Sequence, residues 1–248
     1  MNMSEPITSK TYDLWSKFYD YSFGRLVRNR QARAIEQLHL RPGDRVLDLG
    51  VGTGMTLTHY PLNTTIVGMD LSAGMLAQAA RKRTELKLQH CHLIRADAMT
   101  PPFAPASFDH VVISHTISVV SDPQKLIRWA STLVKPGGSI VVLNHFRSNH
   151  PVVAWFEKVL NPLFIKIGWR SDLSLEDVLT GSDLRVEYRF KMCLLDLWQI
   201  IVLTHDEPSG STHAPPQPAH AAINTAPAAE PRHKPMTVTR SLRPVSGY

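Results

Sequence analysis

From Arg45 onward the chain alternates between short apolar segments and longer amphipathic ones. The short segments are rich in Val, Ile and Leu, which is typical of strands buried on both faces of a sheet. The longer segments, Ala73–Arg83 and Pro123–Val134, have apolar residues at helical spacing, and Ser72 and Asp122 precede them where N-caps are expected. The predicted strands are residues 46–49, 64–69, 91–95, 110–114 and 139–143. This alternation predicts an α/β fold with a parallel sheet and helices on both faces.

Further local signatures mark turns and boundaries. Lys135–Gly138, with the sequence KPGG, is predicted to be a turn between the second helix and the strand that follows. Ser174–Asp177 resembles the capping box of a short helix, and Arg185–Phe190 alternates like a late strand. Eight of the 18 prolines fall in residues 208–248, where aliphatic residues are scarce. Because that composition buries too little apolar surface to fold, residues 206–248 are predicted to be a disordered tail.

Residues 1–38 have a different character from the main predicted domain, residues 39–205. Six aromatic residues are followed by four arginines, and no acid lies between the first arginine and Glu36. The residues are Tyr12, Trp15, Phe18, Tyr19, Tyr21 and Phe23, then Arg25, Arg28, Arg30 and Arg33. Aromatic side chains beside arginines can anchor a helix at the headgroup layer of an anionic membrane. An amphipathic helix packed on the sheet with a solvated basic face gives the same pattern. Both interpretations of this segment stay open on composition alone.

The chain carries 27 Lys and Arg against 21 Asp and Glu, a net charge of +6. That balance suits a membrane surface, a nucleic acid or a phosphate-bearing substrate without choosing among them. Cys91 and Cys193 lie far apart with no Cys/His cluster, which argues against a disulfide framework or a zinc site and favours a cytoplasmic setting. The polar start lacks the apolar core of a secretory signal, and no apolar stretch reaches the roughly 20 residues that span a bilayer. A soluble or peripheral protein is therefore expected.

The predicted strand 46–49 leads directly into a glycine-rich loop, Gly50–Gly54, with the sequence GVGTG. Glycines let the backbone approach a ligand closely, and a helix that follows offers free N–H groups. The spacing differs from the GxGxxG of dinucleotide-binding loops, because the third glycine comes one residue early. Asp70 ends the next predicted strand, where its carboxylate can accept hydrogen bonds from both hydroxyls of a ribose. These features predict a nucleotide-like cofactor at the carboxyl ends of the strands.

The ordered motifs VLDLGVGTG, VGMDLS, RADAM, FDHVVIS and VKPGGSIVVLN, within residues 40–145, resemble those of class I S-adenosylmethionine-dependent methyltransferases. The resemblance implies a three-layer, doubly wound, mostly parallel seven-stranded sheet, the Rossmann-like methyltransferase fold, with an N-terminal amphipathic helix. It also implies S-adenosyl-L-methionine as the cofactor, with Asp97 at the adenine amino group, and no metal. The cofactor-binding residues that it implies are Asp48, Gly50, Gly52, Thr53, Gly54, Asp70, Leu71, Asp97, Ala98, Ser114 and Tyr12.

The segments YDLWSKFYDYSFGR, SHTISVV, LNHF and IGWR resemble bacterial phosphatidylethanolamine N-methyltransferases of the soluble, peripheral type. This second resemblance implies that a monomer at the inner face of an anionic membrane methylates the headgroup amine of a phospholipid, once or successively towards phosphatidylcholine. It favours membrane docking for the N-terminal segment. The residues implied are His145, His115 and Asn144 for catalysis, Arg147 and Arg170 for the lipid phosphate, and Trp15, Phe18, Tyr19, Arg25 and Arg28 for docking.

Other acceptors and another class of function stay open. Enzymes acting on ornithine lipids or quinone precursors share parts of these motifs, and a quinone acceptor would not need the two arginines. A non-catalytic membrane or nucleic-acid-binding module on this fold is the remaining alternative, although the complete glycine loop, Asp48 and Asp70 weigh against it. Nucleic acid is not expected as substrate or partner, because SHTI stands after the fourth strand in place of the amine-methylating signature NPPY.

Overall fold

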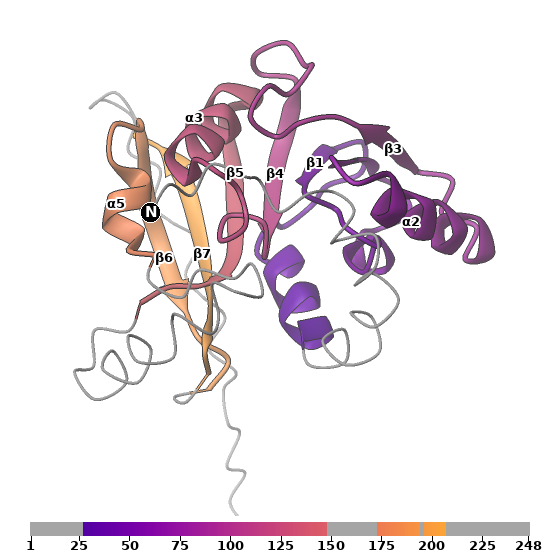
Figure 1. Ribbon diagram of the computed structural model, residues 1–248, viewed down its shortest axis with the longest axis horizontal. Coiled ribbons are helices and arrows are strands. Elements are labelled where there is room, and N and C mark those ends of the chain that lie inside the picture. Colours follow the sequence, from indigo (N-terminus) through magenta and orange to yellow (C-terminus); the bar gives the residue numbers. More distant parts are fainter. Residues whose placement is uncertain (1–26, 148–172, 194–195, 207–248) are drawn as a thin grey trace, which may run out of the picture. The chain divides into compact units, whose positions relative to one another are not determined.

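The computed structural model describes residues 27–147, 173–193 and 196–206. Seven strands of these ranges form one sheet in the order β3-β2-β1-β4-β5-β7-β6 (Figure 1). The strands are β1 (Arg45–Leu49), β2 (Thr65–Asp70), β3 (Cys91–Arg95), β4 (Phe108–Ser114), β5 (Val134–His145), β6 (Leu184–Phe190) and β7 (Trp198–His205). Strands β1 to β5 pair in parallel, whereas β7 runs antiparallel to β5 and β6. The predicted doubly wound, mostly parallel seven-stranded sheet is confirmed.

Helices cover both faces of the sheet, as the alternating pattern predicts. They are the 3-10 helix η1 (Thr56–His59), α2 (Ala73–Glu85), α3 (Pro123–Leu133), α5 (Leu175–Leu179) and a helix over residues 27–36, drawn in indigo in Figure 1. One apolar core packs between the sheet and α3 and α5, with Leu126 and Val178 among its buried residues. The other packs between the opposite face and the helix 27–36, η1 and α2, and includes Ile35 and Ala79. The sheet is therefore buried on both faces, which is why its central strands are almost wholly apolar.

Short polar residues set the starts of the helices. The Ser72 hydroxyl accepts a hydrogen bond from the Met75 N–H at 3.2 Å, and the Asp122 carboxylate accepts one from the Lys125 N–H at 2.9 Å. Ser174 caps α5 in the same way, at 3.4 Å. Each cap satisfies an N–H that has no partner within its own helix. The predicted N-caps at Ser72 and Asp122 are confirmed.

The segment Lys135–Gly138, predicted to be a turn, lies instead within β5. That strand pairs Val134 with Phe108 and next pairs Ser139 with His110, so the residues between them bulge out of the ladder. Gly137 has a φ of 77° in this bulge. The KPGG pattern therefore follows the end of α3 as predicted but forms an irregularity within a strand rather than a turn, because residues on both sides of it pair with β4.

The described part of the predicted segment 1–38 packs against the sheet, with Val27, Ile35 and Leu38 buried in the same core. By its contacts the chain divides into a unit ending at Pro208 and a second one starting at Ser209. The predicted tail lies outside the described residues from residue 207 onward. Among the described residues, no helix has both the length and the apolarity needed to cross a bilayer.

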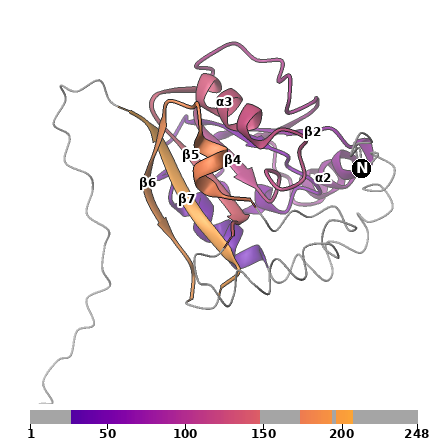
Figure 2. The same ribbon diagram turned by 60° about the vertical axis from the view of Figure 1, so that its left-hand side comes forward.

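The carboxyl ends of β1, β2, β4 and β5 meet at one edge of the sheet, and the strand order reverses between β1 and β4. In open α/β sheets this point is where ligands bind. Figure 2 shows β6 and β7 at the side of the sheet. Because β7 is antiparallel to β5, Trp198 at its start pairs with His145 at the end of β5. The start of β7 therefore reaches the same edge as the glycine loop.

Candidate functional site

The glycine-rich loop after β1 has three residues in the left-handed region of backbone conformation. The φ values are 79° at Gly50, 56° at Gly52 and 75° at Gly54. A Cβ atom at Gly50 would collide with the Thr116 side chain, and one at Gly54 would crowd Leu57. At Gly52, in contrast, no described atom beyond the glycine and its two chain neighbours lies within 4 Å of the position a Cβ would take. The first and third glycines thus permit close packing, and the second presents its backbone to open space.

Asp70, the last residue of β2, lies beside this loop. Its Oδ2 accepts a hydrogen bond from the Gly52 N–H at 2.9 Å, and its Oδ1 accepts one from the Ser72 N–H at 2.9 Å. Burial raises the pKa of this carboxyl group, while the backbone N–H groups act to lower it. The next side chain, Leu71, is exposed. An ordered carboxylate and an exposed apolar side chain therefore stand together at the ligand-binding edge.

Asp48 lies in β1 and is fully buried. Its Oδ2 accepts hydrogen bonds from the hydroxyls of Thr56 at 2.6 Å and Tyr60 at 2.9 Å. Its Oδ1 has no hydrogen-bond partner among the described residues. Burial raises the pKa of Asp48 from 3.8 to about 6, the two hydroxyls act to lower it, and the charge of Asp70 adds to the rise. A buried carboxylate with one oxygen unused is suited to a cationic ligand group.

Other predicted cofactor residues lie around this loop. Ser114 ends β4, and its hydroxyl accepts a hydrogen bond from the Gln31 side chain at 3.3 Å. Asp97 is exposed after β3, and its Oδ1 accepts a hydrogen bond from a backbone N–H two residues later at 2.8 Å. Of the rest, Thr53 is buried, Ala98 is partly buried, and Tyr12 lies outside the described residues. Gln31, which the sequence did not single out, thus connects the helix 27–36 to the end of β4.

Polar side chains gather where β4 and β5 end. Asn144 is buried, and its Oδ1 accepts a hydrogen bond from the Ser118 hydroxyl at 3.2 Å while its Nδ2 donates to the His145 carbonyl at 2.7 Å. The Nδ1 of His145 lies 2.6 Å from the Leu197 carbonyl. A carbonyl only accepts, so Nδ1 carries the ring proton and Nε2 is the nitrogen with the lone pair. Asn144 therefore connects the segment that follows β4 to the end of β5, and the Leu197 carbonyl, just before β7, fixes the tautomer of His145.

His115 directly follows β4 with a φ of 59°. Its ring packs edge-to-face against Trp198, with the ring centroids 6.1 Å apart. Burial lowers the pKa of His115 to about 3, and the positive charge of Arg30 contributes to the drop. The imidazole is therefore neutral at physiological pH and a weak proton acceptor. Of the two histidines predicted to be catalytic, His115 is therefore held neutral, and His145 is buried with its Nδ1 at the Leu197 carbonyl.

A charged pair that sequence reasoning missed connects the helix 27–36 to the start of β7. The Nε of Arg30 donates to both carboxylate oxygens of Asp196, at 3.0 and 2.9 Å, and the Asp196 side chain has no exposed surface. Asp196 also accepts from the Trp198 N–H at 3.1 Å, and the Arg30 guanidinium lies 4.8 Å from the centre of the Trp198 ring. The one signal in the sequence is a lone acid within the apolar run 194–203.

The comparisons with known proteins agree on one family. Residues 47–142 match the methyltransferase domain family. A phosphatidylethanolamine N-methyltransferase of Cereibacter sphaeroides is 34% identical over 179 residues, which cover 72% of this chain and 87% of that protein. The chain belongs to the class I S-adenosylmethionine-dependent methyltransferases. The resemblance in the glycine loop and the strands that follow it is thereby confirmed.

One further relative in sequence and one in structure are also methyltransferases. A demethylmenaquinone methyltransferase of Renibacterium salmoninarum is 36% identical over 119 residues, 48% of this chain and 47% of that one. The crystal structure of an S-adenosylmethionine-dependent methyltransferase from Methanosarcina mazei superposes with a TM-score of 0.57 at 17% identity, covering 69% of this chain and 96% of that chain. At so low an identity, this second similarity supports the fold alone.

S-adenosyl-L-methionine is the cofactor of this methyltransferase, and the geometry at the end of β1 fits it. The cofactor carries a sulfonium and an ammonium group, and the buried Oδ1 of Asp48 has no described partner. The open space at Gly52 gives access to the loop backbone. Within the described ranges, no group of three or more His, Cys, Asp or Glu side chains could hold a metal ion.

Few of the residues predicted to bind the lipid phosphate or the membrane lie in the described ranges. Arg147 is exposed just after β5, where its backbone N–H donates to the Leu173 carbonyl at 2.8 Å. Arg28 is exposed on the helix 27–36. The others, Arg170, Trp15, Phe18, Tyr19 and Arg25, lie outside the described residues.

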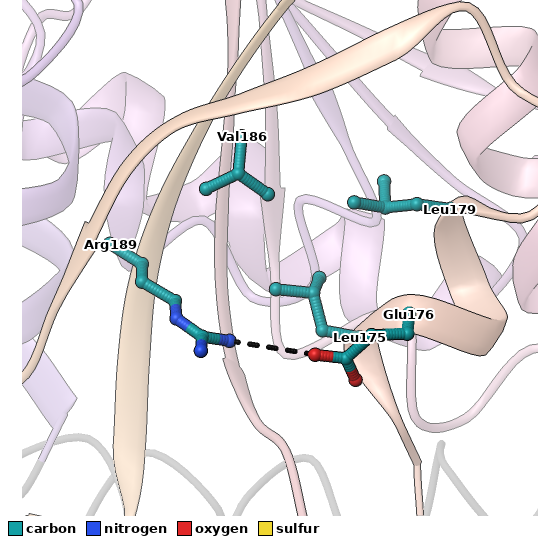
Figure 3. Close-up of a pocket in the computed structure, with 5 residues that line it drawn as sticks. All are labelled: Leu175, Glu176, Leu179, Val186 and Arg189. Carbon is teal, nitrogen blue, oxygen red and sulfur yellow. Dashed lines mark ion pairs between the residues drawn. The ribbon is translucent and has the colours of Figure 1, made fainter.

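A surface cavity of about 300 Å³ lies between α5 and β6 (Figure 3). Its apolar lining comes from Leu175, Leu179 and Val186. Arg189 and Glu176 face each other across one side, 4.0 Å apart. The lining includes none of the predicted site residues, and the glycine loop, not this cavity, has the features that the cofactor needs.

Proposed function

We propose that this methyltransferase transfers the methyl group of S-adenosyl-L-methionine to the amine of phosphatidylethanolamine at a membrane surface. The observation that carries the proposal is the extent of one similarity. The relative named for this activity aligns over 179 residues, well beyond the 47–142 stretch that matches the methyltransferase domain family. A match limited to the cofactor half would say little about the acceptor, whereas this one extends into the remainder of the chain.

In this proposal the loop and two carboxylates hold the cofactor. The backbone at Gly52 contacts it closely, the free oxygen of Asp48 binds its ammonium group, and Asp70 accepts from the ribose hydroxyls. The bound cofactor supplies an electrophilic methyl group. The further contacts proposed come from Gly50, Thr53, Gly54, Leu71, Asp97, Ala98, Ser114 and Tyr12.

The acceptor amine is protonated in water and must lose that proton before it can attack. We assign this role to His145, because its Nδ1 proton is held by a backbone carbonyl and its Nε2 can accept. Asn144 is a positioning residue that holds the ends of β4 and β5 together. His115 stays neutral and contributes a hydrogen bond without adding charge near a cationic acceptor.

The proposed substrate places the enzyme at an anionic membrane on its cytoplasmic side. Arg147 and Arg170 would bind the lipid phosphate, since a guanidinium donates two parallel hydrogen bonds to phosphate oxygens. The N-terminal aromatic and arginine residues Trp15, Phe18, Tyr19, Arg25 and Arg28 would contribute to docking. Both roles are part of the proposal.

A quinone precursor is the second candidate acceptor. The similarity to demethylmenaquinone methyltransferases favours it, although the match to the Renibacterium protein covers 47% of that relative and the match to a Corynebacterium glutamicum protein covers 64%. A quinone-ring carbon carries no phosphate, so Arg147→Gln would leave its methylation unchanged. The same substitution should lower methylation of phosphatidylethanolamine.

The deciding experiment supplies both acceptors together. The purified enzyme is incubated with methyl-labelled cofactor and detergent micelles that contain phosphatidylethanolamine and demethylmenaquinone, and the products are separated and counted. Label in mono-, di- and trimethylated phosphatidylethanolamine supports the proposal and gives the number of methyl groups transferred. Label in the quinone alone, or in an added ornithine lipid alone, overturns it. Asp48→Asn serves as the control with impaired cofactor binding.

A further inference from the structure

Gln31 is a polar residue within a buried apolar stripe. Val27, Gln31, Ala34 and Ile35 follow one another at helical spacing on the helix 27–36, and all four are buried. Gln31 itself is only 4% exposed. The residues of such a stripe are ordinarily apolar, because the stripe packs on a core. A glutamine at this position is therefore expected to have polar partners or a role beyond packing.

Of the two ends of the Gln31 amide, one has a described partner. Its Nε2 donates to the Ser114 hydroxyl at 3.3 Å. Its Oε1 is buried, and no described residue donates a hydrogen bond to it. A buried amide oxygen without a donor destabilises a folded protein, because it has lost its hydrogen bonds to water. An apolar side chain of similar length, such as Met, would avoid that cost, so the unused oxygen indicates a ligand that donates a hydrogen bond.

The Gln31 amide lies where the residues proposed for the cofactor meet those proposed for the acceptor. Its partner Ser114 ends β4 and is one of the proposed cofactor contacts. Two residues later, the Thr116 hydroxyl donates to the Gly50 carbonyl of the glycine loop at 3.3 Å. His115, proposed to contribute a hydrogen bond on the acceptor side, stands between them in the chain. The unused oxygen is therefore beside the end of β4, next to both groups of residues.

The ionisable residues adjacent in sequence to Gln31 and Ser114 carry little net charge. The Arg30 guanidinium is paired at 2.9 Å with Asp196, whose side chain is fully buried. Burial lowers the pKa of His115 to about 3, so its ring is neutral at pH 7. An amide oxygen accepts a hydrogen bond without favouring the charged form of its donor as strongly as a carboxylate does. These surroundings suit an amine that must be neutral in order to attack.

We propose that Oε1 of Gln31 accepts a hydrogen bond from an N–H of the acceptor amine and so orients the amine for attack. This inference rests on the proposed function, which makes the acceptor an amine. That function assigns the cofactor's ammonium group to Asp48 and its ribose hydroxyls to Asp70, which leaves the acceptor amine as the donor for Gln31. An amine attacks through its lone pair, so an oxygen that holds one of its N–H bonds aims the lone pair at the methyl group.

The number of N–H groups on the acceptor gives the first test. Each transfer replaces one N–H by an N–methyl group, and the proton leaves to Nε2 of His145 in the proposed function. The neutral amine therefore has N–H groups in phosphatidylethanolamine and in its monomethyl derivative, and none in the dimethyl derivative. In detergent micelles, Gln31→Met should lower kcat/KM about tenfold for the first two acceptors and less than about twofold for the third. No loss, or an equal loss on all three, overturns the proposal.

Ligand binding gives a second test that needs no methyl transfer. With S-adenosylhomocysteine present, Gln31→Met should weaken the binding of dihexanoyl phosphatidylethanolamine about tenfold in calorimetry. Binding of dihexanoyl phosphatidylcholine, whose headgroup nitrogen has no N–H, should not change. Gln31→Glu keeps an oxygen acceptor and should bind the ethanolamine lipid as tightly as the unmodified protein does. Equal weakening for both lipids, or none for the ethanolamine lipid, contradicts the assigned hydrogen bond.

Stability separates this role from a structural one. If the oxygen serves the substrate, Gln31→Met should unfold at the same temperature as the unmodified protein or higher, and its affinity for S-adenosylhomocysteine should be unchanged. Gln37→Met makes the same chemical change just after the helix, where the Gln37 amide donates to the Arg33 carbonyl at 2.9 Å. That control should keep full activity and lipid binding. A Gln31→Met variant that unfolds at a lower temperature and also binds S-adenosylhomocysteine more weakly shows a structural role and overturns the proposal.

The two proposals fail in distinguishable ways. If the unmodified enzyme methylates phosphatidylethanolamine and Gln31→Met loses activity only on acceptors with an N–H, both are supported. If the unmodified enzyme methylates this lipid and Gln31→Met acts on it equally well, the role of Gln31 is wrong and the acceptor is not. If the unmodified enzyme neither methylates nor binds the lipid, the proposed acceptor is wrong, and the role of Gln31 is wrong with it.

Discussion

The buried carboxylate of Asp48 predicts that the enzyme binds its cofactor more weakly in mild acid. In the fold, burial raises the pKa of Asp48 from 3.8 to about 6. Keeping this group ionised at neutral pH therefore destabilises the free protein by about 3 kcal/mol, and that effect disappears as the pH falls through 6 towards 3.8. A cationic cofactor group next to the carboxylate removes the same penalty by holding Asp48 ionised.

The magnitude follows from that shift. If the bound ammonium returns the pKa of Asp48 to its ordinary value, protonation competes with binding below pH 6, and affinity at pH 5 is about tenfold lower than at pH 7. S-adenosylhomocysteine is the appropriate probe, because it has the same ammonium group and cannot react. Isothermal titration calorimetry in two buffers of different ionisation enthalpy should show release of about one proton per ligand near pH 5.

Asp48→Asn tests the cause, since the hydroxyls of Thr56 and Tyr60 can turn to suit an amide. Affinity of this variant should be lower at pH 7 and nearly constant between pH 5 and 7. Asp206→Asn makes the same change at an exposed position after β7 and should keep the full pH dependence. An unmodified protein whose affinity varies with pH no more than that of the Asp48 variant would refute the reasoning.

Three further predictions concern the frame of the site. Gly50→Ala should destabilise the fold by about 1–3 kcal/mol more than Gly43→Ala in urea unfolding, because both have positive φ but only Gly50 lacks room for a Cβ. Asp196→Asn should lower the free energy of unfolding by about 3 kcal/mol, because the partly buried guanidinium of Arg30 loses its carboxylate. Glu36→Gln, in the exposed pair with Arg33, should lower it by less than about 1 kcal/mol. Because burial lowers the pKa of the His115 imidazole to about 3, the ring takes up a proton between pH 7 and 5 only in the unfolded state, so acid destabilises the fold. His115→Asn removes this effect and should reduce the loss of stability between pH 7 and 5.

Each of these has a result that would contradict it. Equal destabilisation by the two alanine variants would mean that space at Gly50 is not limiting. Similar losses at Asp196 and Glu36 would show that burial does not distinguish the two ion pairs. If the stability of His115→Asn falls with acid as steeply as that of the unmodified protein, other groups account for the acid response.

Local sequence was sufficient to predict much of the framework. The N-caps at Ser72 and Asp122 could be recognised because a short polar side chain reaches N–H groups only two or three residues away. The strands buried on both faces are continuous apolar runs, which is why the parallel order and the helices on both faces could be expected. The glycine loop could be assigned because its conformation depends on residues adjacent in the chain.

Contacts between distant residues were decided only by the tertiary structure. Arg30 and Asp196 are 166 positions apart, and Gln31 and Ser114 are 83 apart. No local pattern specifies such pairs, because they depend on how the helix 27–36, β4 and β7 pack together. Strand β5 extends through a segment whose sequence predicts a turn for the same reason. Its pairing partner, β4, is a separate part of the chain that the local sequence of β5 does not specify.

The chemistry of the ionisable groups shows the same division. The sequence by itself determined that Asp48, His115 and His145 stand at or beside the carboxyl ends of strands, the edge at which open α/β sheets bind ligands. Only the tertiary structure decided that Asp48 has a pKa near 6, that His115 has one near 3, and that the Leu197 carbonyl holds the Nδ1 proton of His145. The physical reason is that residue type sets which proton can move, whereas burial and partners from distant segments set the free energy of moving it.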